Sequence, residues 1–415
     1  MERFIRDQIV YGLKYLPANL AKSAFVKKNS DETKALRRRE FLCGVCHPNK
    51  NYRQIKEANI GWIRIDIPFP YNADGSICDA YLGFKKRAKA YQDNGIKVMA
   101  VTPYPKDYIA FGADIRTEDG EKQVREIARF IIGDLQGYIS GLQITNEMGI
   151  PHFTLPLNMD EAAKFIGVQL YEMHCRRGDV IIGYNSAGPQ ADLHCRMKKY
   201  LKFCDYVGID IYIGCFFNAG GFMWFFDALL DYLWAYTGKP ILIQEFGYLS
   251  GGHPKTKAEK LEILQKYGAS SEKDAKENIV SFVEHLPEHF KRHVKYVCNN
   301  DESRYYDLIF KSDITNHLYC ELPAMTKIPG YDHTPEGQAA FFDEMLFRLY
   351  QKEFVAGAFI YCYQDPQSCH ICGQSDCPTE TRWGLVDRQG EPKPSYYAVK
   401  NAFGRIKWYR ITEKQ

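Results

Sequence analysis

Short apolar runs rich in β-branched residues alternate with amphipathic stretches of helical periodicity from about residue 40 onward. This alternation is typical of a parallel βα repeat whose strands are covered on both faces. We expect strands near 41–46, 61–67, 97–102, 141–146, 180–184, 206–212, 240–245 and 355–363. We expect helices between them, including 81–94, 121–132, 160–177 and 335–350. Eight such units predict an α/β fold, a single (β/α)8 TIM barrel.

A doubly wound open sheet is the rival fold, but it would need a glycine-rich phosphate turn after an early strand. The sequence contains neither GxGxxG nor GxxxxGK[ST]. We therefore expect a barrel over 40–404, an N-terminal helical extension over 1–39 and a C-terminal tail over 405–415. Residues 249–333 form a charged insertion after the seventh strand, on the carboxyl face of the barrel. It is either a surface decoration or a lid that shapes a binding site.

The composition excludes several classes of protein. With 45% apolar and 25% charged residues, the chain is not expected to be disordered, collagen-like or a coiled coil. A net charge of +3 over 415 residues gives no electrostatic footprint for nucleic acid. No run approaches the roughly 18 apolar residues of a membrane span. Thirteen cysteines without a recognisable export signal predict a cytoplasmic protein with mostly free thiols. The oligomeric state is left open.

Two carboxylates stand at the ends of apolar strands. The segment ISGLQITNEMG ends one strand with Asn146 and Glu147, and PILIQEFGY ends another with Glu245. An ionisable residue at the tip of a buried strand is costly, and in a barrel this end carries the active site. Glutamates on the fourth and seventh strands would face each other across the barrel mouth. That arrangement suits cleavage of a glycosidic bond by an acid and a nucleophile.

The chain resembles the retaining glycoside hydrolases of the large (β/α)8 clan, clan A. The resemblance covers roughly residues 41–404 and is carried by WIRIDIPF, ITNE, VGIDIY, QEFG, GAFIYCYQD and RWGLVDRQGEPKPSYYAVK in this order. It is specific to the clan but not to one family within it. It implies an enzyme that hydrolyses O-glycosyl bonds of a carbohydrate substrate, with no cofactor required for catalysis.

The resemblance also implies residue roles. Glu147 would be the general acid/base and Glu245 the nucleophile, while Asn146 would contact the sugar 2-hydroxyl. Arg64 on the second strand and Tyr212 on the sixth would lie beside Glu245. A cation and a phenol hydroxyl would stabilise the ionised form of Glu245, and Glu147 would hold its proton for the first step. The alternative is that both glutamates are structural ion-pair partners.

The clan usually has tryptophan at the end of strand eight, as a platform for the sugar, whereas here Tyr361 occupies this position. Trp383 in the following loop could supply a stacking face instead. His47, just after the first strand, could also contact the sugar.

Two cysteine motifs require separate interpretation. Cys43 to His47 matches the CxxCH pattern of haem attachment, but within a strand the two thiols would point to opposite sides. Cys369, Cys372 and Cys377 resemble a compact zinc knuckle, with Cys362 or His370 as a fourth ligand. We expect a structural zinc there, or else unligated thiols.

The sequence thus predicts a retaining β-glycosidase that acts on small glycosides or oligosaccharides. Two alternatives are kept. A catalytically silent carbohydrate-binding barrel would not need both glutamates. A zinc-dependent barrel hydrolase would need histidine or aspartate ligands at several strand ends, and the strand tips lack the usual histidine pairs.

Overall fold

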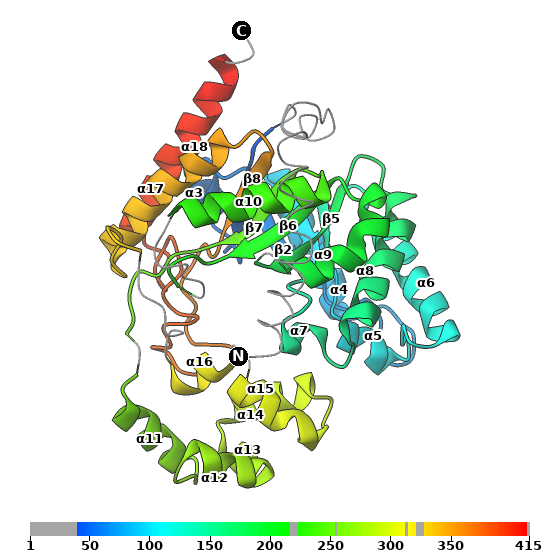
Figure 1. Ribbon diagram of the computed structural model, residues 1–415. Helices are drawn as coiled ribbons and strands as arrows, with labels where there is room; N and C mark the ends of the chain where they lie inside the picture. The colour runs from blue at the N-terminus through cyan, green and yellow to red at the C-terminus, as the bar shows by residue number, and fades with distance from the viewer. Residues whose placement is uncertain are drawn as a thin grey trace.

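Eight parallel strands close into a barrel, in which each strand pairs with the next and β8 pairs with β1 (Figure 1). The computed structural model describes residues 40–188, 190–215, 223–253, 255–311, 314–320 and 328–412. The strands are β1 (Leu42–Cys46), β2 (Trp62–Asp66), β3 (Lys97–Val101), β4 (Gly141–Ile144), β5 (Ile181–Ala187), β6 (Tyr206–Ile211), β7 (Ile241–Phe246) and β8 (Val355–Ile360). The barrel prediction is therefore confirmed, whereas the expected N-terminal extension over 1–39 lies outside the described residues.

Helices surround the barrel on the outside and alternate with its strands (Figure 1). Those of the barrel layer are α3 (Tyr52–Glu57), α4 (Asp79–Asp93), α5 (Pro105–Phe111), α6 (Glu118–Leu135), α7 (Pro151–Thr154), α8 (Met159–His174), α9 (Ala191–Met197), α10 (Met223–Thr237), α17 (Pro335–Gln351) and α18 (Pro394–Thr412). Short 3₁₀ turns cover Lys198–Phe203 and Glu302–Arg304. Among the described residues, no helix combines the length and apolar character needed to cross a lipid bilayer.

Local sequence signals determine where these helices begin. Asn158 caps α8 in a capping box with Glu161, so that two otherwise unpaired backbone N–H groups gain acceptors. Thr334 caps α17, and Pro335 occupies its first position, where no N–H is needed. The start of α17 also marks the return of the chain from the insertion to the barrel.

Alternate residues of each strand face the two sides of the barrel wall. On β1, Cys43 and Val45 belong to the large core between strands and helices. Leu42 and Cys46 face the barrel interior, where they pack with side chains such as Trp62. The thiols of Cys43 and Cys46 thus lie on opposite faces of one strand, as the two-residue period requires, which argues against a shared haem or redox site.

The last helix differs from the expected boundaries. We expected a tail over 405–415, but α18 continues without interruption to Thr412. No proline follows Gly404, and the side chain of Ile406 is fully buried, so the helix gains by extending past the expected end. Residues 405–412, which we expected to follow the barrel as a tail, thus form the last part of α18.

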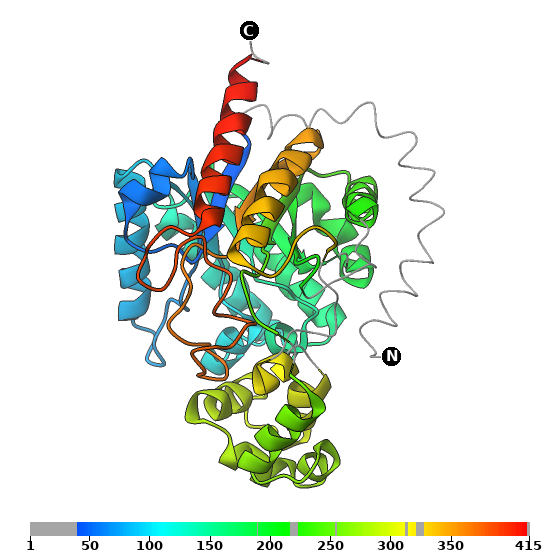
Figure 2. The ribbon, with the colours of Figure 1, turned by 90° about the vertical axis from the view of Figure 1, so that its left-hand side faces the viewer.

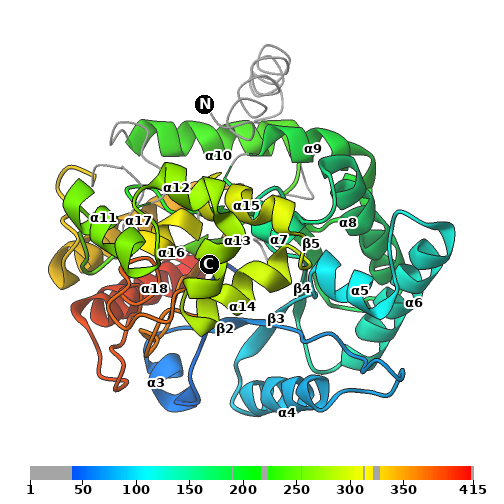
Figure 3. The same ribbon diagram turned by 90° about the horizontal axis from the view of Figure 1, so that it is seen from below.

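The insertion after β7 forms a helical lobe. Its helices are α11 (Lys257–Lys266), α12 (Glu272–Glu277), α13 (Ile279–His285), α14 (Glu288–Val297), α15 (Tyr305–Lys311) and α16 (Ile314–Tyr319). They gather below the barrel in Figure 2 and lie across its end in Figure 3. The loop after β8 shares the separate apolar core of this lobe through Cys369, Ile371, Cys372 and Cys377. The insertion therefore lies at the carboxyl end of the strands, where a barrel carries its active site.

A second contact joins the lobe to a helix that follows β3. The Tyr296 hydroxyl on α14 donates a hydrogen bond to Asp107 on α5, which follows β3. Lys106 places its ammonium 4.0 Å from the centre of the Tyr296 ring. The lobe thus contacts loops that follow both β3 and β8, an arrangement that fits a lid better than a peripheral decoration.

Candidate active site

Glu245 lies at the end of β7, where two donors hold its carboxylate. Arg64 on β2 donates from Nη1 to Oε1 at 2.7 Å, and the Tyr212 hydroxyl donates to Oε2. All three side chains are buried, with exposed fractions of 3% for Arg64 and 6% for Glu245. The carboxylate therefore has a fixed orientation and is paired with a buried cation.

The charged and neutral states of these partners follow from their surroundings. Burial is the largest single effect on Arg64 and opposes its charged form, but the negative charges around it, that of Glu245 first, together raise the pKa of Arg64 well above its usual range. Burial, and then the charge of Glu245, raise the pKa of Tyr212 well above its usual value. Arg64 therefore stays cationic and Tyr212 stays protonated, so both remain donors to Glu245.

Glu147 follows β4 on a strained turn. The backbone of Thr145 and Glu147 has positive φ angles of 57° and 43°, which side chains with a Cβ rarely adopt. The strand ladder ends at Ile144, earlier than the sequence predicted, because the chain turns here. The Glu147 N–H donates to Asn185 Oδ1 at 2.9 Å, which holds the turn in place.

Electrostatics link the two glutamates. The charges of Glu245 and Glu147 both act on the hydroxyl of Tyr212 and raise its pKa after the larger effect of burial. The same two charges act on the hydroxyl of Tyr104, at the end of β3. Glu147 directly follows the turn after β4 and Glu245 is near the end of β7, so both residues stand at the carboxyl ends of barrel strands.

Asn146 is fixed by three donors. Its Oδ1 accepts from Arg64 Nη2, from Gln143 Nε2 at 3.0 Å and from Asn185 Nδ2 at 2.9 Å. Because the amide oxygen is the acceptor in every one of these contacts, the amide nitrogen must point the other way. The amide nitrogen of Asn146, the residue before Glu147, therefore remains a donor that these contacts do not use.

The strand-eight end carries an aromatic group. Tyr361 meets Tyr212, Trp383 and His47 edge to face, with ring centroids 5.8, 5.9 and 5.3 Å apart. Burial, and then the charge of Glu380, raise the pKa of Tyr361 well above its usual value, and its hydroxyl donates to Glu380 at 2.6 Å. His47 is exposed at the rim, so it remains available to a ligand.

Trp383 does not fit the role expected from the sequence. Its side chain is fully buried, and its indole N–H donates to the Thr379 carbonyl. Its ring meets Tyr212 edge to face at 5.1 Å. The ring of Trp383 therefore offers no exposed face on which a sugar could stack. It packs against Tyr212 and Tyr361 instead.

Three buried polar residues of the barrel strands, Gln143, Asn185 and Asp210, were not predicted from the sequence as part of the site. Gln143 accepts from Arg64 Nε at 2.8 Å, and Asn185 donates to Asp210 at 2.7 Å. Asp210 on β6 pairs with Glu245 in the strand register, next to an irregularity of the ladder. The sequence signal for these residues was a polar side chain within an otherwise apolar strand. This signal indicates a site residue only once the pairing register of the strands is known.

Asp210 allows a prediction about pH and stability. Burial, and then the charge of Glu245, raise the pKa of Asp210 well above its usual value, so the folded protein holds a proton that the unfolded chain releases near pH 4. Stability therefore falls as the pH rises from about 4 toward the folded-state pKa. Asp210→Asn can still accept from Asn185, and it removes this penalty.

We expect Asp210→Asn to gain stability over the wild type by about 1.4 kcal/mol per pH unit across that range. Urea unfolding at several pH values measures the difference. The exposed Asp179→Asn is the matched control and should show no such slope. A difference between Asp210→Asn and the wild type that stays constant with pH would mean that Asp210 is ionised in the folded protein.

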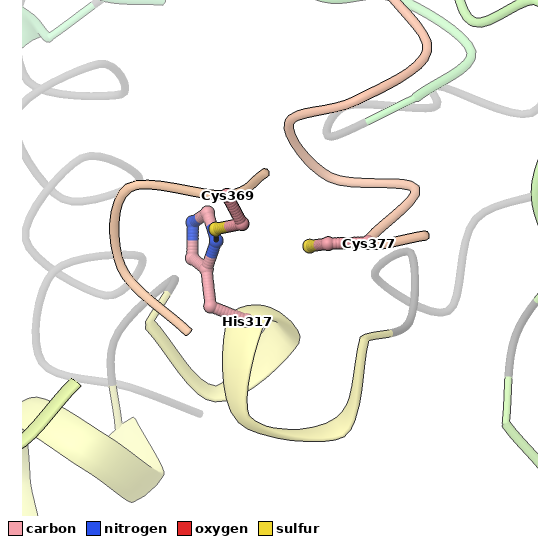
Figure 4. A group of neighbouring side chains, drawn as sticks. All are labelled: His317, Cys369 and Cys377. Atoms are coloured by element: carbon pink, nitrogen blue, oxygen red, sulfur yellow. Dashed lines mark hydrogen bonds between the residues drawn. The ribbon is translucent and has the colours of Figure 1, made fainter. Parts of the chain in front are cut away.

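Three cysteines of the loop after β8 also come together. Cys369 and Cys377 lie near His317, and Cys372 and Cys377 lie near Cys320. His317 lies on α16 in the lobe (Figure 4), and Cys320 directly follows this helix. The fourth ligands considered from the sequence, Cys362 and His370, lie elsewhere: the Cys362 thiol donates to the Gln364 carbonyl, and His370 is exposed.

Comparisons with known proteins agree with the fold. No protein-family model matches the sequence, and no curated protein matches it. Among solved structures, the GH53 catalytic domain of Ignisphaera aggregans is 16% identical with a TM-score of 0.53, over 88% of this chain and 96% of that chain. A family 39 glycoside hydrolase from Bacteroides cellulosilyticus WH2 is 14% identical with a TM-score of 0.52, over 88% and 63%. A β-glucuronidase of Bacteroides uniformis is 14% identical with a TM-score of 0.51, over 87% and 35%.

This chain spans about half the length of two GH2 β-galacturonidase structures from Eisenbergiella tayi, covering 51% and 50% of them. The three solved structures with TM-scores above 0.5 share its barrel fold at low sequence identity. The chain therefore has the (β/α)8-barrel fold of these glycoside hydrolases.

Proposed function

We propose that the protein is a retaining β-glycosidase, which hydrolyses the O-glycosidic bonds of small glycosides or oligosaccharides by double displacement. The observation that carries the proposal is the carboxylate of Glu245, held by Arg64 and Tyr212 at the carboxyl end of β7. Glu147 stands at the end of β4, and its charge acts on the same tyrosine. Two carboxyl groups on either side of one sugar are what this reaction needs.

In the first step, the Glu147 carboxyl donates its proton to the glycosidic oxygen while a Glu245 carboxylate oxygen attacks the anomeric carbon. The bond from the anomeric carbon to the leaving oxygen breaks, and the leaving group departs as an alcohol. The sugar remains as an ester on Glu245, with inverted configuration. Arg64 and Tyr212 orient the attacking oxygen before the reaction.

In the second step, the Glu147 carboxylate takes a proton from water, and the water oxygen attacks the anomeric carbon. The ester bond to Glu245 breaks and its carboxylate is restored, so the second inversion returns the original configuration. The donor of Asn146 lies beside Glu147 and would hydrogen-bond the sugar 2-hydroxyl, a contact that strengthens in the transition state. This chemistry requires no cofactor.

The absence of disulfides among the thirteen cysteines favours a reducing compartment for the reaction. None of them is in a disulfide, which suits a reducing environment such as the cytoplasm. We therefore favour small glycosides that reach the cell interior over extracellular polymers as substrates.

A panel of chromogenic α- and β-glycosides, with wild-type protein, tests the proposal. We expect turnover of at least one β-glycoside, with NMR showing a first product of the same anomeric configuration. Hydrolysis of α-glycosides only would contradict the β assignment, and an inverted first product would contradict retention. Sugar binding without turnover would instead identify a carbohydrate-binding barrel.

Glu147→Ala has a distinct expected signature. For alkyl or sugar leaving groups, which need protonation, we expect kcat/KM to fall by about 10²–10⁴-fold. For a dinitrophenyl glycoside, whose leaving group needs no proton, the first step should be little affected. Added azide should raise turnover of this substrate and give a glycosyl azide of retained configuration, because it replaces water in the second step.

The exposed Glu126→Ala on α6 serves as the matched control and should behave like the wild type. An equal loss on good and poor leaving groups, without any effect of azide, would remove Glu147 from the role of acid/base.

A further inference from the structure

We propose that Cys320, Cys369, Cys372 and Cys377 form a tetrahedral site for one zinc ion, which joins the helical lobe to the loop after β8. The last three residues belong to this loop, whereas Cys320 follows α16 in the lobe. All four side chains are buried. This inference is independent of the proposed glycosidase activity.

The distances between sulfurs fit a bound metal. In a tetrahedral zinc site with Zn–S bonds of about 2.3 Å, neighbouring sulfurs lie about 3.8 Å apart. The sulfurs of Cys320 and Cys372 are 3.8 Å apart. Those of Cys320, Cys372 and Cys377 all lie within 4.8 Å of one another, as do those of Cys369 and Cys377. Figure 4 shows the side chain of Cys377 pointing toward Cys369, whose sulfur lies beside the ring of His317.

The loop has the backbone geometry of a metal-binding knuckle. The N–H groups of Ile371 and Cys372 both point to the sulfur of Cys369, at 3.4 Å. Such donors orient a thiolate ligand and stabilise its negative charge. The Cys-x-x-Cys spacing brings the second sulfur back toward the first, as in structural zinc sites.

His317 supports this ligand set from outside. Its Nδ1 lies 3.2 Å from the sulfur of Cys369, and its Nε2 lies 3.7 Å from Glu380. An imidazole held between a ligand and a carboxylate is a common outer partner of a metal site. We therefore assign four sulfur ligands, with His317 as a positioning residue that donates to Cys369.

The lobe gains from a metal crosslink. Its helices have between 6 and 10 residues, which is too short to be stable alone. Its apolar core is separate from that of the barrel and includes all four thiol side chains. Small cores of this kind usually need a metal or a disulfide in addition to apolar burial.

The same loop reaches the candidate active site. Glu380, three residues after Cys377, accepts from the Tyr361 hydroxyl at 2.6 Å, and Tyr361 packs against Tyr212. Zinc would thus hold the lobe over the barrel mouth and fix one wall of the site. Its role is structural, because the four sulfurs fill the coordination sphere.

Zinc analysis of the full-length protein tests the site. The experiment uses an untagged chain purified from zinc-supplemented cells, and its metal content is measured by plasma mass spectrometry. The wild type should contain about one zinc per chain, and Cys320→Ser or Cys372→Ser should contain at least ten-fold less. Cys298→Ser is the matched control, since Cys298 is buried in the same lobe core but outside the thiol cluster, and it should keep its zinc.

Two further measurements separate the alternatives. The His317→Gln variant should keep one zinc per chain. Loss of zinc from this variant would mean that histidine is one of the ligands, in place of the four-sulfur set. Treatment of the wild type with excess mercurial should release about one zinc per chain, a result that does not depend on any variant folding. Zinc-free wild-type protein, or a Cys320–Cys372 disulfide found by mass spectrometry, would overturn the proposal.

Discussion

We expect Glu245→Ala to lower kcat/KM for an aryl β-glycoside by about 10⁴-fold or more, because it removes the atom that bonds to the anomeric carbon. Azide should restore part of this turnover, since the shortened side chain leaves room for a small nucleophile. The product should be a glycosyl azide of inverted configuration, because a single displacement then replaces two. NMR of the product measures this outcome directly.

Two comparisons show whether the loss is chemical. Glu245→Gln keeps the volume and the hydrogen bond from Arg64, so it should retain the barrel fold, with some loss of stability because Arg64 loses its counter-charge, and it should remain inactive. Glu353→Ala changes an exposed residue before β8 and should keep full activity. Substantial activity in Glu245→Gln, or an azide product of retained configuration, would assign the nucleophile to another residue.

The fold could be predicted from the sequence because the strands are buried on both faces. Runs such as PILIQEF are continuous apolar segments, and each of the eight predicted strands overlaps an observed strand, β7 in the case of PILIQEF. Strand ends were less accurate where the backbone leaves the ladder: β4 stops at Ile144 because Thr145 turns with positive φ. Such a turn at a β-branched residue has no sequence signal of its own.

The candidate site was predictable in part. Arg64, Asn146, Glu147, Tyr212 and Glu245 stand at or near strand ends, and parallel strands of a barrel bring these ends to one mouth. The parts of the structure that could not be predicted depend on contacts between segments that are distant in the sequence. Cys320 and Cys372 are 52 positions apart, so only the folded lobe reveals that they meet. The burial of Trp383 likewise depends on how one loop folds back over β8.

Arg64 has the second-largest expected effect, and it acts on stability as well as on activity. Its guanidinium is the buried cation that contacts Glu245 and Asn146, and side-chain exposure is 3% for Arg64 and 8% for Glu245. Removing one partner of a buried ion pair leaves the other charge without compensation. We expect Arg64→Met to lower the free energy of unfolding by about 3–5 kcal/mol at neutral pH.

A double-mutant cycle with Glu245→Gln separates the lost charge pairing from lost packing. If the pairing dominates, Arg64→Met should cost less in the Glu245→Gln background than in the wild type, with a coupling of about 0.5–3 kcal/mol. Urea unfolding of the four proteins gives this value, and the exposed Arg53→Met serves as the control. Strictly additive effects would show that Arg64 stabilises the barrel through its contacts with Gln143 and Asn146 instead, and that the Glu245 carboxylate does not depend on it.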